Sequence, residues 1–363
     1  MSGIAGKNFQ ISIFGESHGE ALGITLNGLP AGFKIDMDFV KKEMARRAPG
    51  KDAFSTARKE ADEAEIVSGF FEGKTTGAPL TALIRNTNTI SKDYSGIKSK
   101  MRPAHADYPA FVKYEGANDY RGGGHFSGRI TAAIVFAGAV AKQIIMKDEI
   151  YIASHILSIE NIKDEAFDYA DIKKETLEEL LKMDFPVIST EKGEHMKQSI
   201  LNAKEDGDSV GGIIETVILN KIVGLGDPFF DSVESTLSRL LFSIPAVKGV
   251  EFGSGFEITK MRGSIANDEL YIENDQIKTH TNNNGGIQGG LSIGMPIVFK
   301  TAFKPTPSIS KTQRTVDIES RENVSLNIAG RHDPCIVQRD VPVVESMDAI
   351  EILDLLMENR KWK

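Results

Sequence analysis

The chain has 363 residues, of which 40% are hydrophobic and 26% are charged, a composition typical of a folded globular protein and not of a disordered one. A formal net charge of −8 argues against general nucleic-acid binding, and a single cysteine excludes a disulfide framework or a multi-cysteine metal site. No secretory signal is visible, and the longest apolar run, residues 132–141, is too short to cross a bilayer, so we expect a cytoplasmic protein without a membrane segment.

The first half of the chain predicts two strongly signalled helices among several strands. Asp36 can cap a helix that Pro49-Gly50 would stop. Apolar residues cover most of the circumference of the second helix, so we expect that helix inside the fold. In chain order, the predicted elements are a strand at 9–13, a helix at 36–47, strands at 64–71 and 79–84, and a long helix at 128–147.

The second half continues the mixture of strands and helices without a regular βαβ period. The predicted strands are at 150–159, 211–219 and 290–301, and the predicted helices are at 177–183, 194–204, 232–242 and 343–359. No Ser/Pro-rich linker divides the chain, so we predict a single α+β domain over residues 1–363, with large sheets and internal helices. The order of the strands cannot be predicted from this pattern.

Positive charge is concentrated in three segments of an otherwise acidic chain. Residues 34–60, 100–131 and 304–339 together hold 19 basic and 12 acidic residues. This distribution fits either an ordinary solvated surface or a local anionic ligand.

Two histidine-containing segments could supply acid–base chemistry. The sequence GESHG at 15–19 follows the first strand and would present Ser17 and His18 on a tight loop. In RPAHADY at 102–108, His105 can act as a general acid, and Arg102 can bind a phosphate or carboxylate with both arms of its guanidinium. A surface histidine in the first segment and a helix cap in the second are the structural alternatives.

A run of three glycines precedes the long apolar helix in RGGGHFSGR at 121–129. Backbone N–H groups of such a loop at a helix N-terminus can bind an anion. Arg129 lies in the first turn, where its charge opposes the helix dipole, so the sequence predicts an anionic ligand beside it.

Three further segments are rich in turn residues or charge. TNNNGGIQGG at 281–290 suits a loop whose backbone approaches a planar or anionic ligand, and KPTPS at 304–308 offers an ammonium and hydroxyls; each is otherwise a plain turn. In RHDPC at 331–335, flanking arginines would hold Asp333 ionised, whereas Cys335 is expected to be a small buried residue. The seven histidines show no i, i+4 pairing, so we predict no metal site.

Taken as a set, these segments resemble the chorismate synthase family in order and approximate spacing, from about residue 9 to residue 350. The resemblance implies a β-α-β sandwich assembled as a homotetramer. It implies the 1,4-anti elimination of phosphate from 5-enolpyruvylshikimate-3-phosphate to give chorismate, the last common step of the shikimate pathway to aromatic amino acids. It further implies a requirement for reduced FMN without net redox change. NADPH would serve only as an indirect reductant, and an external flavin reductase would supply the reduced FMN.

The resemblance also implies roles for individual residues. The catalytic set would be His105, His18 and Asp333, with Ser17 as a relay. The cofactor set would be Arg47, His125, Phe126, Ser127, Ala246, Gly289, Lys304, Pro305, Thr306, Pro307, Ser308 and Arg331, in which Arg47 is the position associated with NADPH. The substrate's anionic groups would be held by Arg46, Arg47, Arg102, Arg129 and Arg339.

This chain departs from the family pattern at some of these positions. His125-Phe126 replaces a more common Arg-Ser pair, which could change flavin affinity or its pH dependence, and Ala104 stands where glycine is common. Two other hypotheses use the same residues: a flavin-dependent oxidoreductase acting on a phosphorylated carboxylate, and a non-enzymatic binder of phosphorylated metabolites.

Overall fold

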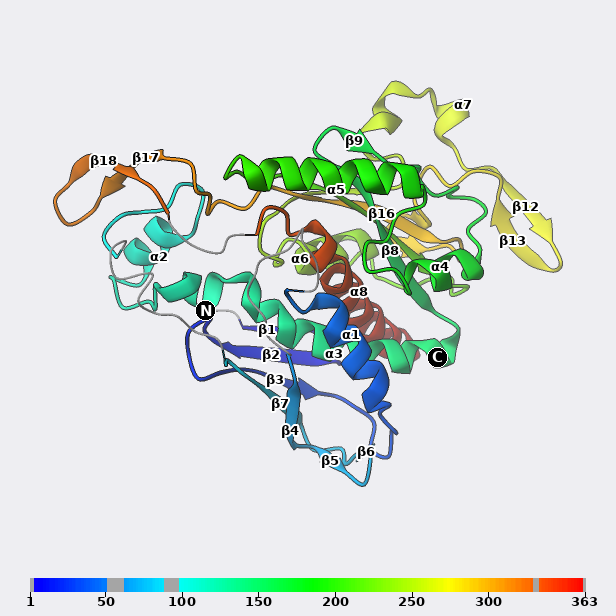
Figure 1. Cartoon of the computed structure of the whole chain (residues 1–363). Helices are drawn as coiled ribbons and strands as arrows, with labels where there is room; N and C mark the ends of the chain where they lie inside the picture. The colour runs from blue at the N-terminus through cyan, green and yellow to red at the C-terminus, as the bar shows by residue number, and fades with distance from the viewer. Residues whose placement is uncertain (1–2, 51–61, 88–97, 329–332, 362–363) are drawn as a thin grey trace.

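Two five-stranded antiparallel sheets enclose a layer of helices in the computed structural model, which describes residues 3–50, 62–87, 98–328 and 333–361 (Figure 1). The first sheet has the strand order β1-β2-β3-β7-β4. Its strands are β1 (Ile4–Ala5), β2 (Gln10–Gly15), β3 (Ala21–Asn27), β4 (Ala64–Ser68) and β7 (Leu80–Arg85). The α+β class and the internal helices predicted from the sequence are therefore confirmed.

The second sheet has the order β11-β16-β10-β8-β9, with β10 at its centre. Its strands are β8 (Tyr151–Ile159), β9 (Ile162–Lys163), β10 (Gly212–Leu219), β11 (Val247–Phe252) and β16 (Ile297–Phe303). The helices α4 (Lys174–Leu180) and α5 (Thr190–Glu205) contact β8 from the outer side of this sheet (Figure 1). The second sheet thus has helices on both of its faces.

The described part of the chain also contains four small hairpins and several short helices outside the two large sheets. The hairpins are β5–β6 (Phe70–Phe71 and Lys74–Thr75), β12–β13 (Leu270–Glu273 and Gln276–Thr279), β14–β15 (Ile287–Gln288 and Leu291–Ser292) and β17–β18 (Gln313–Asp317 and Glu322–Leu326). The short helices are α2 (Asp107–Lys113), η2 (Arg121–Phe126), η3 (Gly128–Ile130), η4 (Met146–Asp148), η5 (Gly255–Lys260) and α7 (Gly263–Ala266). Hairpins β12–β13 and β17–β18 project from opposite ends of the molecule (Figure 1).

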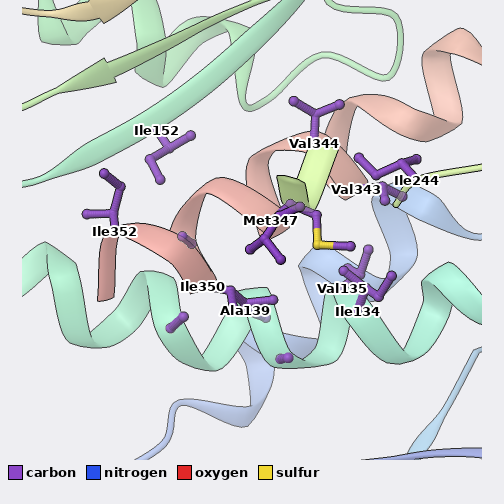
Figure 2. Packing of buried hydrophobic residues seen from close by; sticks show 14 of the residues in the cluster. Ile134, Val135, Ala139, Ile152, Ile244, Val343, Val344, Met347, Ile350 and Ile352 are labelled. Atoms are coloured by element: carbon purple, nitrogen blue, oxygen red, sulfur yellow. The ribbon is translucent and has the colours of Figure 1, made fainter. Parts of the chain in front are cut away.

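The inner layer is built on α3 (Thr131–Ile145) and α8 (Val337–Arg360), with α1 (Met37–Arg47) and α6 (Val233–Leu241) beside them. Every residue of α3 except Gln143 is buried, and α3 packs on α8 and on the first sheet, while α8 packs on β8 and β10. A Cβ on Gly138 would lie 2.2 Å from the Cβ of Ser346, so this glycine permits the close approach of the two helices. Figure 2 shows the apolar side chains that meet there.

The segment Gly128–Asp148 is long and apolar enough to cross a membrane by length and composition. In this structure 89% of its most apolar window is buried inside the protein. Its composition is explained by its place between the two sheets, as the sequence pattern predicted.

Several sequence predictions need correction in their boundaries. The strand predicted at 64–71 is the two strands β4 and β5, which are separated at Gly69 (φ 76°), and the helix predicted at 177–183 is α4 at Lys174–Leu180. The strand predicted at 290–301 is two strands, because Gly294 adopts a left-handed conformation (φ 81°) and Pro296 lacks an N–H, so the ladder breaks between β15 and β16. The closing helix starts at Val337, six residues before the predicted start, with Pro342 inside it. The helix at 36–47 is confirmed, and the carboxylate of Asp36 accepts hydrogen bonds from the N–H groups of Asp38 and Phe39.

A cluster of buried charges joins α1, α3 and α8. Glu345 accepts a hydrogen bond from Arg46 at 2.6 Å and another from Lys142 at 2.7 Å, and Lys142 also contacts Glu43 at 2.5 Å. Burial alone would raise the pKa of Glu43, but Lys142 and Arg46 lower it to about 2. The four side chains therefore satisfy one another inside the helical layer.

Asp348, one turn further along α8, is buried without such a partner. Neither of its carboxyl oxygens has a hydrogen-bond partner among the described residues. Burial, together with Glu345 and Glu351, raises the pKa of Asp348 well above its ordinary value, against the opposing effect of Lys142. The folded protein thus keeps Asp348 protonated at pH values at which an exposed aspartate is ionised.

We expect Asp348→Asn to remove a pH-dependent loss of stability. The unfolded carboxyl ionises above about pH 4, so the wild-type fold should lose about 1.4 kcal/mol per pH unit for as long as the folded carboxyl stays protonated. Urea unfolding at pH 5, 6 and 7 measures the free energy of unfolding of both proteins. The value of the variant minus that of the wild type should increase by this amount for each pH unit. Asp38→Asn, at a side chain that is 97% exposed, is the matched control. A difference that does not change with pH would contradict the assignment.

Candidate active site

A cavity of about 740 Å³ lies where the first sheet, the end of α1, the glycine loop and the start of α8 meet. Its walls combine apolar side chains from β1 and β2 with charged side chains from loops that are far apart in the sequence. The polar and charged lining residues are Arg47, Arg102, His105, His125, Ser127, Arg129, Thr131, Arg239, Ser243, Lys248, Lys304, Thr306, Ser308, Asp333, Arg339 and Asp340.

His105 lies in the turn that leads into α2 and is held by a half-buried carboxylate. Its Nδ1 is 2.7 Å from Oδ1 of Asp107, so this nitrogen carries the proton and Nε2 is left on the far side of the ring. Arg102 donates to both oxygens of the same carboxylate, at 2.7 and 2.8 Å. Burial would raise the pKa of Asp107, but the hydrogen bonds from His105 and Arg102 hold it well below its usual value. The Asp107 anion thus fixes the orientation of both cavity residues.

The three glycines of η2 bring this turn close to the GESHG loop. Gly122, Gly123 and Gly124 all have positive φ, at 59°, 88° and 56°. A Cβ on Gly122 would lie 2.3 Å from the ring of His18, and one on Gly123 would lie 3.1 Å from Nε2 of His105. Side chains are excluded here because two histidines pack on the backbone from different loops.

The loop also positions His125 and Ser17. Nδ1 of His125 is 2.8 Å from the carbonyl oxygen of Gly15, so the two motifs are joined directly. Ser17 donates its backbone N–H to the carbonyl of Gly124 at 3.0 Å, and its buried hydroxyl oxygen has no hydrogen-bond partner among the described residues. Phe126, which lines the cavity, is 41% exposed.

Asp62 is the anion that stabilises Arg129 at the start of the long helix. It accepts hydrogen bonds from Arg129 and, at 2.8 Å, from Nη1 of Arg47. Burial would raise the pKa of Asp62, but the two arginines keep it below its usual value. Arg129 is therefore balanced by a carboxylate of the chain itself, which corrects the inference that its position requires an anionic ligand.

Arg47 is more deeply engaged than the sequence suggested. Its Nε donates to Thr131 at 3.1 Å and its Nη2 to the carbonyl of Gly128 at 2.8 Å, in addition to the contact with Asp62. Burial lowers its pKa to about 10, with Arg339 and Arg129 acting in the same direction and Asp62 opposing them. Since each of its three nitrogens already donates to the protein, Arg47 forms part of the cavity wall.

The start of α8 and the 304–308 segment close the opposite side. Arg339 donates to Oδ2 of Asp333 at 2.7 Å, and Thr306 donates to the carbonyl of Asp333 at 2.6 Å. Lys304 donates to the carbonyl of Ala104 at 2.5 Å, which joins this segment to the His105 turn. Burial and the neighbouring Lys248 lower the pKa of Lys304. A bound anion would oppose both effects, because it favours the charged form of the ammonium.

Some predicted site residues are not in this cavity. Arg46 points into the helical layer and pairs with Glu345 and Glu43, which corrects its assignment to substrate binding. Gly289 is absent from the lining, and its segment is held by Asp268, whose carboxylate accepts hydrogen bonds from the N–H groups of Asn283 and Asn284 at 2.7 and 2.9 Å.

Other predicted residues lie beside the cavity or cannot be placed. His18 and Ser17 contact the loop behind Gly122, which itself lines the cavity. Pro305 lies between lining residues without being one, whereas Ala246 and Pro307 line the cavity. Arg331 is outside the described residues.

The sequence analysis missed the acidic residues of the site. Asp62 and Asp107 hold cavity arginines in place, and Asp340 lines the cavity directly. Asp107 had a usable signal, because it stands two residues after His105 within a segment already singled out. Across the described ranges, no group of three His, Cys, Asp or Glu side chains is arranged to hold a metal ion.

Comparisons with known proteins agree with one another. The family model for chorismate synthase matches residues 9–357. The chain is 46% identical over 357 residues to chorismate synthase of Dehalococcoides mccartyi, covering 98% of this chain and 97% of that protein. It is 45% identical over 359 residues to chorismate synthase of Thermococcus kodakarensis, covering 99% and 98% of the two chains.

A solved structure agrees with these sequence relatives. A crystal structure of chorismate synthase superposes with a TM-score of 0.77 at 30% identity, covering 98% of this chain and 93% of that one. The family model spans the cavity segments from β2 onward. The chain therefore belongs to the chorismate synthase family and is a lyase of that type.

Proposed function

We propose that the cavity converts 5-enolpyruvylshikimate-3-phosphate to chorismate and phosphate, the last common step of the shikimate pathway. The observation that supports this most is the collection of cations in one cavity, since the substrate carries a phosphate and two carboxylates. Arg102, Arg129 and Arg339 line it, and each is already oriented by a carboxylate of the chain. Preorganised charges of this kind bind and orient an anionic substrate without reorganising as it reacts.

The family implies a reduced flavin, and the residues of the cavity fit one. A volume of about 740 Å³ is in the range of small-molecule sites. Apolar side chains such as Ile4 and Ile13 suit a flat ring, and the ammonium of Lys304 with the hydroxyls of Thr306 and Ser308 suits a phosphate. We assign FMN to the wall formed by His125, Phe126, Ser127, Ala246, Lys304, Thr306, Pro307 and Ser308. When bound, reduced FMN supplies a transient electron that assists the departure of phosphate, with no net redox change.

Three side chains are assigned to proton transfer. His105 exchanges a proton at Nε2, since Nδ1 is held by Asp107. His18, behind Gly122, is the proton donor to the leaving phosphate, with the buried hydroxyl of Ser17 as a relay. The carboxylate of Asp333 accepts a proton, and its contact with Arg339 keeps it oriented toward the cavity wall.

The remaining proposals concern the source of the reduced flavin, the domain organisation and the oligomeric state. Because all three nitrogens of the Arg47 guanidinium donate to groups of the protein, we place NADPH outside this cavity, as the reductant of an external flavin reductase. We propose that residues 1–363 act as one domain, which is supported by the apolar cluster that joins both sheets. We propose a cytoplasmic homotetramer, which is supported by exposed apolar side chains such as Phe229 (85%), Phe230 (92%) and Ile272 (77%).

An anaerobic assay with the substrate and reduced FMN tests the proposal. We expect chorismate and inorganic phosphate in equal amounts, with the flavin still reduced after many turnovers. Stoichiometric oxidation of the flavin with product would indicate the oxidoreductase hypothesis instead. Tight binding of the substrate without turnover would indicate a non-enzymatic binder.

A further inference from the structure

Asp340 is a carboxyl group of the cavity wall that the assignments above do not use. It lies in the first turn of α8, one residue after Arg339, and its residue is 8% exposed. Within the described part of the chain, its carboxyl makes neither a hydrogen bond nor an ion pair. Asp333, the other acidic lining residue, is instead held by Arg339 at 2.7 Å.

Several groups act on the Asp340 carboxyl in opposite directions. Burial raises its pKa to about 7, and Asp333 adds to this effect. Arg339 and Arg47 oppose it, as does the N-terminal end of α8, where a helix favours negative charge. Near neutral pH, one further charge beside the Asp340 carboxyl would therefore be enough to change its protonation state.

The substrate brings that charge. A phosphate or carboxylate entering beside an ionised Asp340 would meet a like charge in a desolvated wall, which is unfavourable. The neutral acid carries an O–H donor, and its carboxyl has no hydrogen-bond partner among the residues that the structure describes, so it can donate to an anionic oxygen. Binding of the anion and protonation of Asp340 favour each other.

We propose that Asp340 is a substrate-binding residue that takes up a proton from solvent when the anionic substrate enters, and that it then donates a hydrogen bond to a phosphate or carboxylate oxygen. This inference rests on the proposed function, since it requires the anionic substrate in this cavity. The step forms one O–H bond on the Asp340 carboxyl, with the proton supplied by water or buffer, and it involves no oxidation or reduction.

Calorimetric titration of the substrate into the full-length protein tests the proposal. Oxidised FMN is present so that no turnover occurs, and buffers of different ionisation heat give the number of protons taken up. At pH 8 the wild type should take up about 0.9 proton more than Asp340→Asn. Between pH 7 and pH 8 its affinity should fall about fivefold relative to that variant.

Two further variants make the result specific. Asp340→Ala removes the donor, so at pH 6 it should bind the substrate about tenfold or more weakly than the wild type. Asp348→Asn, on the same helix outside the cavity, should keep the proton uptake of the wild type. Equal uptake by the wild type and Asp340→Asn, or release of a proton on binding, would overturn the inference. Failure of the folded wild type to bind the substrate would overturn the proposed function itself, and this inference with it.

Discussion

His105→Ala should lower turnover by about 10²-fold or more, the range typical of a general acid or base. The structure gives the reason: Nδ1 is committed to Asp107 at 2.7 Å, so the ring can present one fixed nitrogen, Nε2, on the glycine-loop side. Binding of FMN should be largely retained, because hydroxyls and the Lys304 ammonium remain. The turnover number under anaerobic conditions, with the dissociation constant of FMN measured separately, separates the two effects.

The control for this prediction is His195→Ala. His195 is an exposed residue of α5, on the outer side of the second sheet, and its loss should leave turnover unchanged. Asp107→Asn is a second comparison, since it removes the anion that orients His105 without removing the imidazole. A wild-type turnover number in His105→Ala would end the assignment of proton transfer to this residue.

Asp62→Ala should lower the free energy of unfolding by about 3–5 kcal/mol, the range measured when one partner of a buried ion pair is removed. Two arginines lose their carboxylate at once, because Arg47 and Arg129 both donate to it and both are buried. Urea unfolding at pH 7 measures the loss. Inorganic phosphate should restore part of the stability of this variant, since it can bind between the two guanidinium groups of the folded state.

Asp38→Ala is the matched control for Asp62→Ala. Its carboxylate is 97% exposed and 3.8 Å from Lys41, so its removal should change the free energy of unfolding by less than about 1 kcal/mol. A similarly small change in Asp62→Ala would show that the two arginines do not depend on that carboxylate.

Helices were predictable where their signals are local. The helix at 36–47 has a capping aspartate at one end and Pro49-Gly50 at the other, and both signals lie within the segment itself. The order of the strands was not predictable, because β10 pairs Gly212 with Phe303 and with Ile159, and no local pattern encodes such distant partners. β3 was missed although Leu22, Ile24 and Leu26 alternate with Gly23, Thr25 and Asn27, which is the pattern of a half-buried strand.

The difference between local signals and distant contacts also explains which site residues could be predicted. Arg46 and Arg47 are adjacent in the sequence, yet successive residues of a helix point about 100° apart, so one guanidinium enters the helical layer and the other reaches the cavity. A sequence motif that contains both arginines does not show which of the two reaches the cavity. Asp62 was missed for a related reason, since it lies 67 residues from Arg129 and its role exists only in the folded chain.

The position of α8 has a consequence for biosynthesis. This helix follows every other element in chain order, yet it fills the space between the two sheets. All strands of the two sheets are synthesised before residues 337–360. Until these residues leave the ribosome, the nascent chain lacks the helix that packs between the sheets. Its apolar surfaces remain accessible to chaperones and to other nascent chains until then, so we expect the two sheets to reach their final packing only after α8 has been synthesised.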